Sequence, residues 1–141
     1  MLVAGSLLAA CKTTTGPAAP ALGSGQPFEL VMQQAATIPA SGSAPISLTL
    51  TEVKDSRCPS GAQCIWAGYV AVSVRLTDAT AVPQTARISL LYKGLPGYAP
   101  DSVAVTLNQR AYWLRLLDVA PYPSLVGSSQ PPTATLRLRP R

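Results

Sequence analysis

The sequence predicts an all-β domain, an antiparallel β-sandwich of about seven strands. Three observations predict it. Apolar and polar residues alternate with a period of two in most segments between turns, which places apolar side chains on one face of a strand and polar ones on the other. The 141 residues include 14 prolines and 10 glycines, which end strands and form tight turns. No segment shows the apolar stripe of an amphipathic helix.

In chain order, we expect strands at residues 28–33, 46–53, 65–77, 86–92, 103–107, 112–119 and 133–138. The clearest is 46–53, where isoleucine and leucine alternate with serine and threonine, so that one face is buried and one is wet. In 65–77 the valines share the face opposite Ser73 and Arg75. This alternation predicts strands that each contribute one face to a core.

The connections between these strands contain the residues that turns require. We expect them at residues 38–43, 78–83, 93–101, 108–109 and 121–132. Two alternatives remain open: a flattened barrel in place of the sandwich, and a helix over the leucine-containing segment 112–119. Pro121 and Pro123 would stop such a helix early, which favours a strand.

Residues 1–10 are all apolar or small and predict a removable secretory signal. The run is too short to cross a bilayer as a helix, which takes about 20 residues. No Lys or Arg precedes Cys11, and we expect the basic part of the signal to lie upstream. Residues 11–25 lack periodicity and predict a flexible tether, and 26–141 a single folded domain.

The four residues Leu8-Ala9-Ala10-Cys11 resemble a bacterial lipobox, in which the cysteine is lipidated and becomes the new N-terminus. The resemblance implies a lipoprotein of the cell envelope, held to a membrane by acyl chains on Cys11. Lys12 follows in place of an aspartate, and by resemblance to enteric lipoproteins this favours the periplasmic face of the outer membrane over the inner membrane. The alternative is an ordinary buried apolar segment.

The other two cysteines, Cys58 and Cys64, flank a short segment of turn formers. In an oxidising compartment such a pair persists as a disulfide, and closing so small a loop stabilises the fold by about 2 kcal/mol. A zinc site needs three or four ligands, and the chain has no histidine. A redox pair normally has Cys-x-x-Cys spacing before a helix. We therefore predict a structural disulfide and neither a metal site nor a cofactor.

The segment around these cysteines is the densest motif of the chain. Asp55-Ser56-Arg57-Cys58-Pro59, four residues, then Cys64-Ile65-Trp66-Ala67-Gly68 resemble a pattern of small secreted bacterial proteins and lipoproteins, Asp-x-Arg-Cys-Pro followed by Cys-x-Trp-x-Gly. Residues 112–123, which end in Val119-Ala120-Pro121-Tyr122-Pro123, resemble the second landmark of that group. The resemblance implies export and a β-domain, and it implies no activity.

Physical chemistry predicts a structural role for this motif. Trp66 is large enough to cap the core beside the disulfide, and Gly68 relieves crowding or forms a bulge where a strand begins. Asp55 and Arg57 lie two residues apart, so they can pair or hold loop backbone by charge-assisted hydrogen bonds. The alternative is that Asp55, Arg57 and Trp66 form a recognition patch.

The formal net charge of +5 does not predict a nucleic-acid partner, because the basic residues are scattered. The exception is the C-terminal tail, where Arg137 and Arg139 alternate with leucines and predict the wet face of a last strand. For an exported protein, this charge favours attraction to anionic lipid head groups or cell-wall polymer.

Catalysis is not expected. Without histidine, no serine–histidine or cysteine–histidine nucleophile forms. Residues 94–97 are too short and proline-rich for a phosphate cradle. A glycosidase would need two carboxylates facing across a cleft, and the candidates are Glu29, Glu52, Asp55, Asp78, Asp101 and Asp118.

We therefore expect a non-catalytic envelope lipoprotein that presents loops to an envelope protein or glycan. The loops expected to make contact are residues 55–68, 93–101 and 121–132. Tyr98 and Tyr122 are candidate contacts, since aromatic residues in loops often anchor interfaces; the alternative is packing over a proline. An inhibitor of an envelope or host hydrolase is the second hypothesis and a carbohydrate-active enzyme the third.

Overall fold

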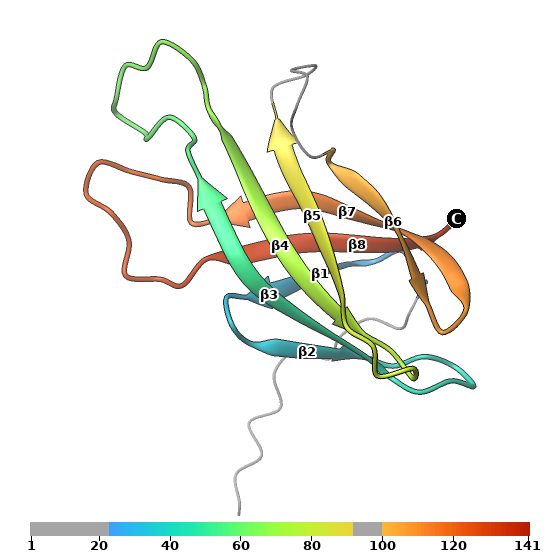
Figure 1. The fold of residues 1–141 in the computed structure, drawn as a ribbon. Helices are drawn as coiled ribbons and strands as arrows, with labels where there is room; N and C mark the ends of the chain where they lie inside the picture. Colours follow the sequence, from blue (N-terminus) through green and yellow to red (C-terminus); the bar gives the residue numbers. More distant parts are fainter. Residues whose placement is uncertain (1–22, 92–99) are drawn as a thin grey trace, which may run out of the picture.

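The fold consists of two antiparallel sheets stacked face to face, as predicted (Figure 1). The computed structural model describes residues 23–91 and 100–141, and these contain strands but no helix. The predicted signal peptide, Cys11, Tyr98 and most of the predicted loop 93–101 lie outside the described residues. The strands are β1 (Pro27–Val31), β2 (Ala35–Ile38), β3 (Ile46–Asp55), β4 (Tyr69–Thr77), β5 (Gln84–Leu91), β6 (Ser102–Leu107), β7 (Arg110–Ala120) and β8 (Thr133–Pro140).

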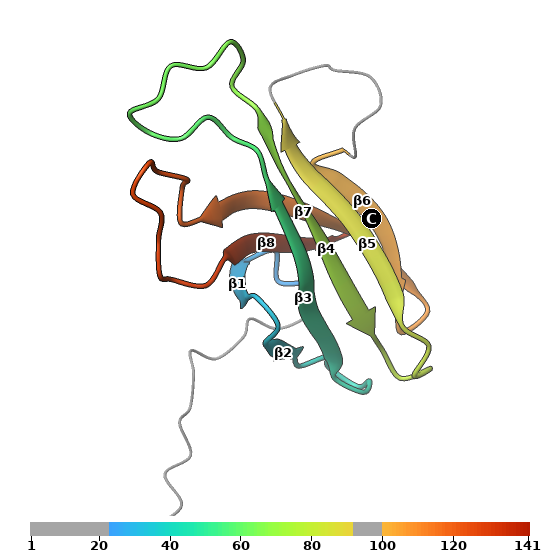
Figure 2. The same ribbon diagram turned by 60° about the vertical axis from the view of Figure 1, so that its left-hand side comes forward.

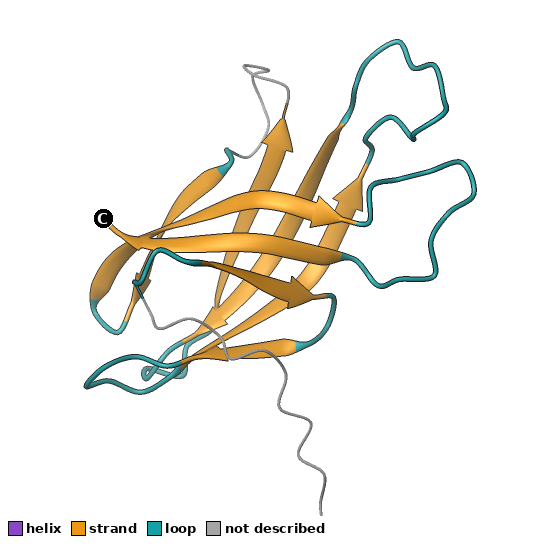
Figure 3. Cartoon of the chain, turned by 180° about the vertical axis from the view of Figure 1, so that it is seen from behind, coloured by secondary structure: helices purple, strands orange, loops and turns teal. Residues whose placement is uncertain are grey.

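Each sheet has four strands, and every neighbouring pair is antiparallel. Sheet A has the order β1-β8-β7-β6, and sheet B has the order β2-β3-β4-β5. Figure 3 views the molecule from the side of sheet A, whose strands cross those of sheet B. The sheets are not closed into a barrel, so the sandwich and not the flattened barrel is the observed architecture.

The predicted strands all occur, with two differences. The four-residue strand β2 was not expected, so the domain has eight strands, and its last residue, Ile38, lies in the segment expected to be a turn. Ala35 and Ala36 lack the β-branched or aromatic character that marks a strand in sequence. Strand β4 begins at Tyr69, so the residues after Cys64 belong to the loop. The segment 112–119 lies within strand β7, which excludes the helix alternative.

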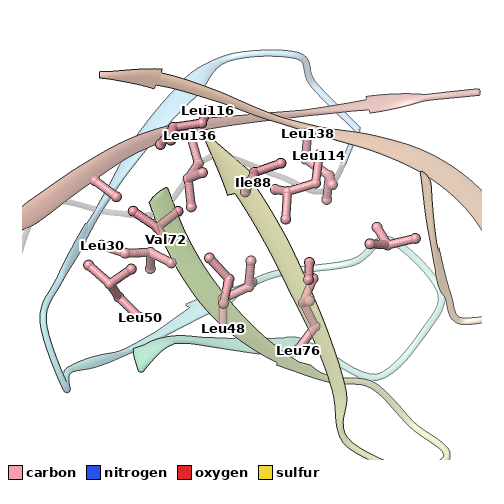
Figure 4. Packing of buried hydrophobic residues seen from close by; sticks show 14 of the residues in the cluster. Leu30, Leu48, Leu50, Val72, Leu76, Ile88, Leu114, Leu116, Leu136 and Leu138 are labelled. Carbon is pink, nitrogen blue, oxygen red and sulfur yellow. The ribbon is translucent and has the colours of Figure 1, made fainter. Parts of the chain in front are cut away.

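The core fills the space between the sheets with the residues that the alternation placed on one face. Figure 4 shows leucines and valines of the two sheets pointing toward each other. The labelled buried residues are Leu48, Leu50, Val72, Leu76 and Ile88 from sheet B and Leu30, Leu114, Leu116, Leu136 and Leu138 from sheet A. Each fully buried side chain of this size stabilises the fold by about 1.5–3 kcal/mol.

The two ends of the sandwich differ. At one end the connections are short. The shortest is Asn108-Gln109, where both residues have positive φ, as in a type I′ hairpin. At the other end β3 and β7 each carry an irregularity, near Thr51 and Leu117, and then continue into long loops. Bulges of this kind bend and twist a strand. The described residues include no helix long and apolar enough to cross a membrane.

Candidate functional site

Two long loops leave the same end of the sandwich and lie next to each other (Figures 1 and 2). The cysteine loop, residues 56–68, joins β3 to β4, and the proline loop, residues 121–132, joins β7 to β8. They come from different sheets, yet the amide of Ser60 donates a hydrogen bond of 2.9 Å to the carbonyl of Pro123. Ser60 and Ser124 form an isolated parallel bridge. The two loops therefore form one surface.

The cysteine loop is closed at two levels. At its base, the amide of Cys58 donates a 2.8 Å hydrogen bond to the carbonyl of Ala67, which continues the pairing of β3 with β4. Farther out, the sulfur atoms of Cys58 and Cys64 lie at bonding distance, and their Cα atoms are 5.9 Å apart. The predicted cysteine pairing is thus present, and it restricts the loop to a small set of conformations.

Asp55 and Arg57 form the ion pair that their spacing predicted. The Arg57 guanidinium donates to both carboxylate oxygens of Asp55, at 2.9 Å from Nε and 2.6 Å from a terminal nitrogen. The backbone amide of Arg57 also donates to Asp55, at 3.1 Å. Only 11% of the arginine side chain and 22% of the aspartate side chain are exposed. This two-pronged geometry is the strong form of an arginine–carboxylate contact.

Arg57 also connects the two loops. Its guanidinium donates to the carbonyl of Val119 at 2.9 Å and to that of Pro121 at 3.4 Å. The same group lies 4.5 Å from the ring centroid of Tyr122, a cation–π contact. One side chain therefore holds the start of the proline loop against the base of the cysteine loop.

Gly68 is required by a close backbone approach. Its φ is +73°, and a Cβ at this position would collide with the backbone carbonyl of Ser56. The amide of Ser56 donates a 2.8 Å hydrogen bond to the carbonyl of Tyr69, which draws the two sides of the loop base together. The prediction that Gly68 relieves crowding where the strand begins is consistent with this geometry.

Both loops expose large apolar side chains. Of the seven large hydrophobic side chains that are exposed in the described residues, five lie on these loops: Ile65, Trp66, Tyr122, Leu125 and Val126. We call these five residues the loop-tip patch. The expectation that Trp66 caps the core is wrong, because 61% of Trp66 is exposed. The reason is that β4 starts only at Tyr69, which leaves Trp66 in the loop beyond the end of the core.

The structure brings together most of the residues that the motif singled out. Asp55, Arg57 and Tyr122 are in contact, and Gly68 lies at the base of the same loop. Trp66 lines a shallow hollow together with the disulfide. Sequence reasoning missed Ile65, Leu125 and Val126 as exposed residues; the available signal was the Leu125-Val126 pair inside a stretch of proline, serine and glycine.

Glu52 and Asp101 are held in ion pairs on the surface of the sheets. Glu52 accepts a hydrogen bond from Ser73 at 3.1 Å and pairs with Lys54 and Arg87, and these contacts lower its pKa. Asp101 pairs with Arg115 at 2.9 Å. In the part of the chain that the structure describes, no three acidic, cysteine or histidine side chains come together as metal ligands would.

No family model, curated protein or solved structure matches the chain. The function is therefore argued from the loop surface itself.

Proposed function

We propose that the protein is a non-catalytic module of the cell envelope, anchored by lipid on Cys11, that binds a partner protein through the loop-tip patch. The observation that carries the proposal is the exposure of five large apolar side chains on loops that a disulfide and Arg57 hold together. A surface of this kind is typical of an interaction site, because exposed apolar residues cluster where a partner covers them.

The chemistry of the loops favours a protein as the partner. Arg57 is the only charged residue in the two loops, and its charge is paired with Asp55. The exposed aliphatic side chains of Ile65 and Val126 offer nothing to the hydroxyl groups of a glycan, whereas a protein surface can bury them. Tryptophan and tyrosine are enriched among the residues that dominate protein interfaces.

A second candidate function is inhibition of an envelope or host hydrolase. The protrusion of the cysteine loop beyond the sheets and its disulfide closure favour it (Figure 2). A loop that is already ordered loses little conformational entropy when it enters an active site. If the protein is such an inhibitor, the partner is a hydrolase, and saturating amounts of the protein should lower the turnover of that hydrolase.

The test of the partner is site-specific photocrosslinking in the native envelope. A crosslinking residue at position 65 or 126 should capture the same protein, and one at Val82 should not. Val82 is a matched control, because it is 64% exposed and apolar but follows the other end of β4.

The captured protein is then purified and titrated with the lipid-free domain. Trp66→Ala should weaken binding at least about tenfold, and Val82→Ala should leave it unchanged. Equal effects of the two substitutions would overturn the proposal. So would Trp66-dependent binding of the lipid-free domain to vesicles in the absence of any protein, which would identify the patch as a membrane contact.

The anchor has a separate test. Cys11→Ser should move the protein from the membrane fraction to the soluble fraction, and mass spectrometry should find acyl chains on the parent protein only. A parent protein that keeps residues 1–10 and carries no lipid would refute the anchor but would leave the loop-tip proposal standing.

A further inference from the structure

The outer face of sheet A carries a concentration of arginines that the loop-tip function does not use. The register of β7 with β8 places Arg115 directly opposite Arg137, and Trp113 directly opposite Arg139. Like charges in directly opposite positions destabilise a sheet. Two arginines therefore occupy directly opposite positions on a surface where fold stability alone disfavours them.

These side chains line a hollow of about 340 Å³. Its walls are Ser102, Trp113, Arg115, Arg137, Arg139 and Pro140, and none of these is acidic. Arg137, Arg139 and Pro140 of this hollow belong to the C-terminal half of β8. In Figure 3 the C-terminus lies at the opposite side of the molecule from the two long loops. The volume of the hollow is at the lower end of the range for small-molecule sites, about 300–1,000 Å³.

The positive charge in this hollow is only partly compensated. Arg115 pairs with Asp101 at 2.9 Å. Within residues 23–91 and 100–141, Arg137 and Arg139 form no ion pair, and the Nε atom of Arg137 is buried without a hydrogen-bond partner. The hydrogen bonds that the Arg137 guanidinium can donate are thus not all supplied by the described residues.

A fourth arginine borders the same region. The guanidinium of Arg141 lies 5.1 Å from the ring centroid of Trp113, and the backbone amide of Arg141 donates a 3.0 Å hydrogen bond to the carbonyl of Ala111. These two contacts hold the end of the chain beside the hollow. Two carboxylates on the outer face, Glu29 and Asp118, lie opposite Thr135, which is two residues along β8 from Arg137, and neither lines the hollow.

We propose that this hollow is a binding site for a phosphate monoester carried on a small organic body of about the size of a sugar. Arg137 and Arg139 bind the phosphate oxygens, since the guanidinium fork matches phosphate geometry. A dianion balances the uncompensated arginines better than a single carboxylate does. Trp113 and Pro140 form the apolar wall against which the organic part packs.

The site can be read out by tryptophan fluorescence. The chain has two tryptophans, so Trp66→Phe leaves Trp113 as the single reporter inside the hollow. Titration of this protein with glucose 1-phosphate should change the emission in a saturable way, and inorganic phosphate should bind more weakly. Glucose without phosphate should have no effect.

Arginine substitutions in the Trp66→Phe protein distinguish binding in the hollow from nonspecific attraction of phosphate to a positively charged protein. Arg137→Gln and Arg139→Gln should each weaken binding about tenfold or more. Arg75→Gln is the matched control, because it removes the same charge from an exposed position on β4 in the other sheet, and it should change affinity less than twofold. Melting curves establish that each variant is folded.

Binding to lipid vesicles, measured beside binding to soluble sugar phosphates, identifies the source of the phosphate. If binding to phosphatidic acid vesicles depends on Arg137 and soluble sugar phosphates bind weakly, the phosphate belongs to a lipid head group. If the soluble compounds bind tightly, it belongs to a free metabolite. Equal weakening by all three substitutions, or no saturable binding to any of these phosphates, would overturn the proposal.

Discussion

The two ends of the sandwich use different means to hold their connections, and they present different surfaces. At the turn end, Asp78 accepts hydrogen bonds from the amides of Thr80 and Asn108, at 2.9 and 2.8 Å. Asn108 in turn donates to the carbonyl of Ala44 at 3.0 Å. Three short connections are thus joined by polar contacts.

At the loop end, a disulfide, the Asp55–Arg57 pair and the Ser60–Pro123 hydrogen bond hold much longer connections together. Five apolar side chains on these loops are more than half exposed to solvent: Ile65, Trp66, Tyr122, Leu125 and Val126. Short turns would close this end with fewer exposed apolar groups. The disulfide and hydrogen bonds at the loop end therefore hold an exposed apolar surface in place. The hydrogen bonds at the turn end only connect neighbouring strands.

The largest effect expected is that of Gly68→Ala. The added Cβ meets both a positive φ and the carbonyl of Ser56, so we expect a loss of about 3 kcal/mol or more in the free energy of unfolding. Gly42→Ala is the matched control, since Gly42 has a φ of +70° but no atom within 4 Å of the added Cβ. It should cost about 1 kcal/mol. Urea denaturation measures both, and equal losses would contradict the close-approach argument.

Arg57→Ala should come next. It removes the partner of a mostly buried carboxylate and the hydrogen bonds to the proline loop, with an expected loss of about 2–3 kcal/mol. Hydrogen exchange at the amide of Ser60 should also become faster, because the two loops separate more often. Arg87→Ala, which removes an exposed ion pair of 3.7 Å with Glu52, should cost less than about 1 kcal/mol. An unchanged exchange rate at Ser60 would show that Arg57 does not join the loops.

Replacing both Cys58 and Cys64 with serine should lower the free energy of unfolding by about 2 kcal/mol. The melting temperature should fall by roughly 5–10 °C. Reducing the parent protein should reproduce this shift, and reductant should leave the double variant unchanged. A parent protein whose melting temperature is insensitive to reductant would contradict a stabilising role for the bridge.

The smallest effect is a pH dependence at the turn end. The hydrogen bonds from Thr80 and from the amide of Asn108 lower the pKa of Asp78 below its ordinary value of 3.8. The ionised group therefore stabilises the fold above its unfolded pKa, and this contribution is lost as the pH falls through the lowered folded pKa. Asp78→Asn should lose stability less steeply than the parent as the pH is lowered from 5 toward 3, and parallel curves from urea denaturation would contradict the pKa shift.

The sequence by itself determined seven of the eight strands, their buried faces and the cysteine pair, and it missed β2. These follow from local patterns: the period-two alternation in segments such as 46–53, and two cysteines separated by a short run of turn formers. It also predicted that Asp55 and Arg57 interact, because residues two apart lie on one side of an extended chain.

Only the tertiary structure decided which distant segments meet. The bond from Arg57 to the carbonyl of Val119 joins residues 62 apart in the chain, and the opposition of Arg115 to Arg137 depends on the register of β7 with β8. Trp66 is exposed because β4 begins after it and not before it. The physical reason is the same in each case: strand order, register and strand ends are set by long-range packing, which a local pattern does not contain.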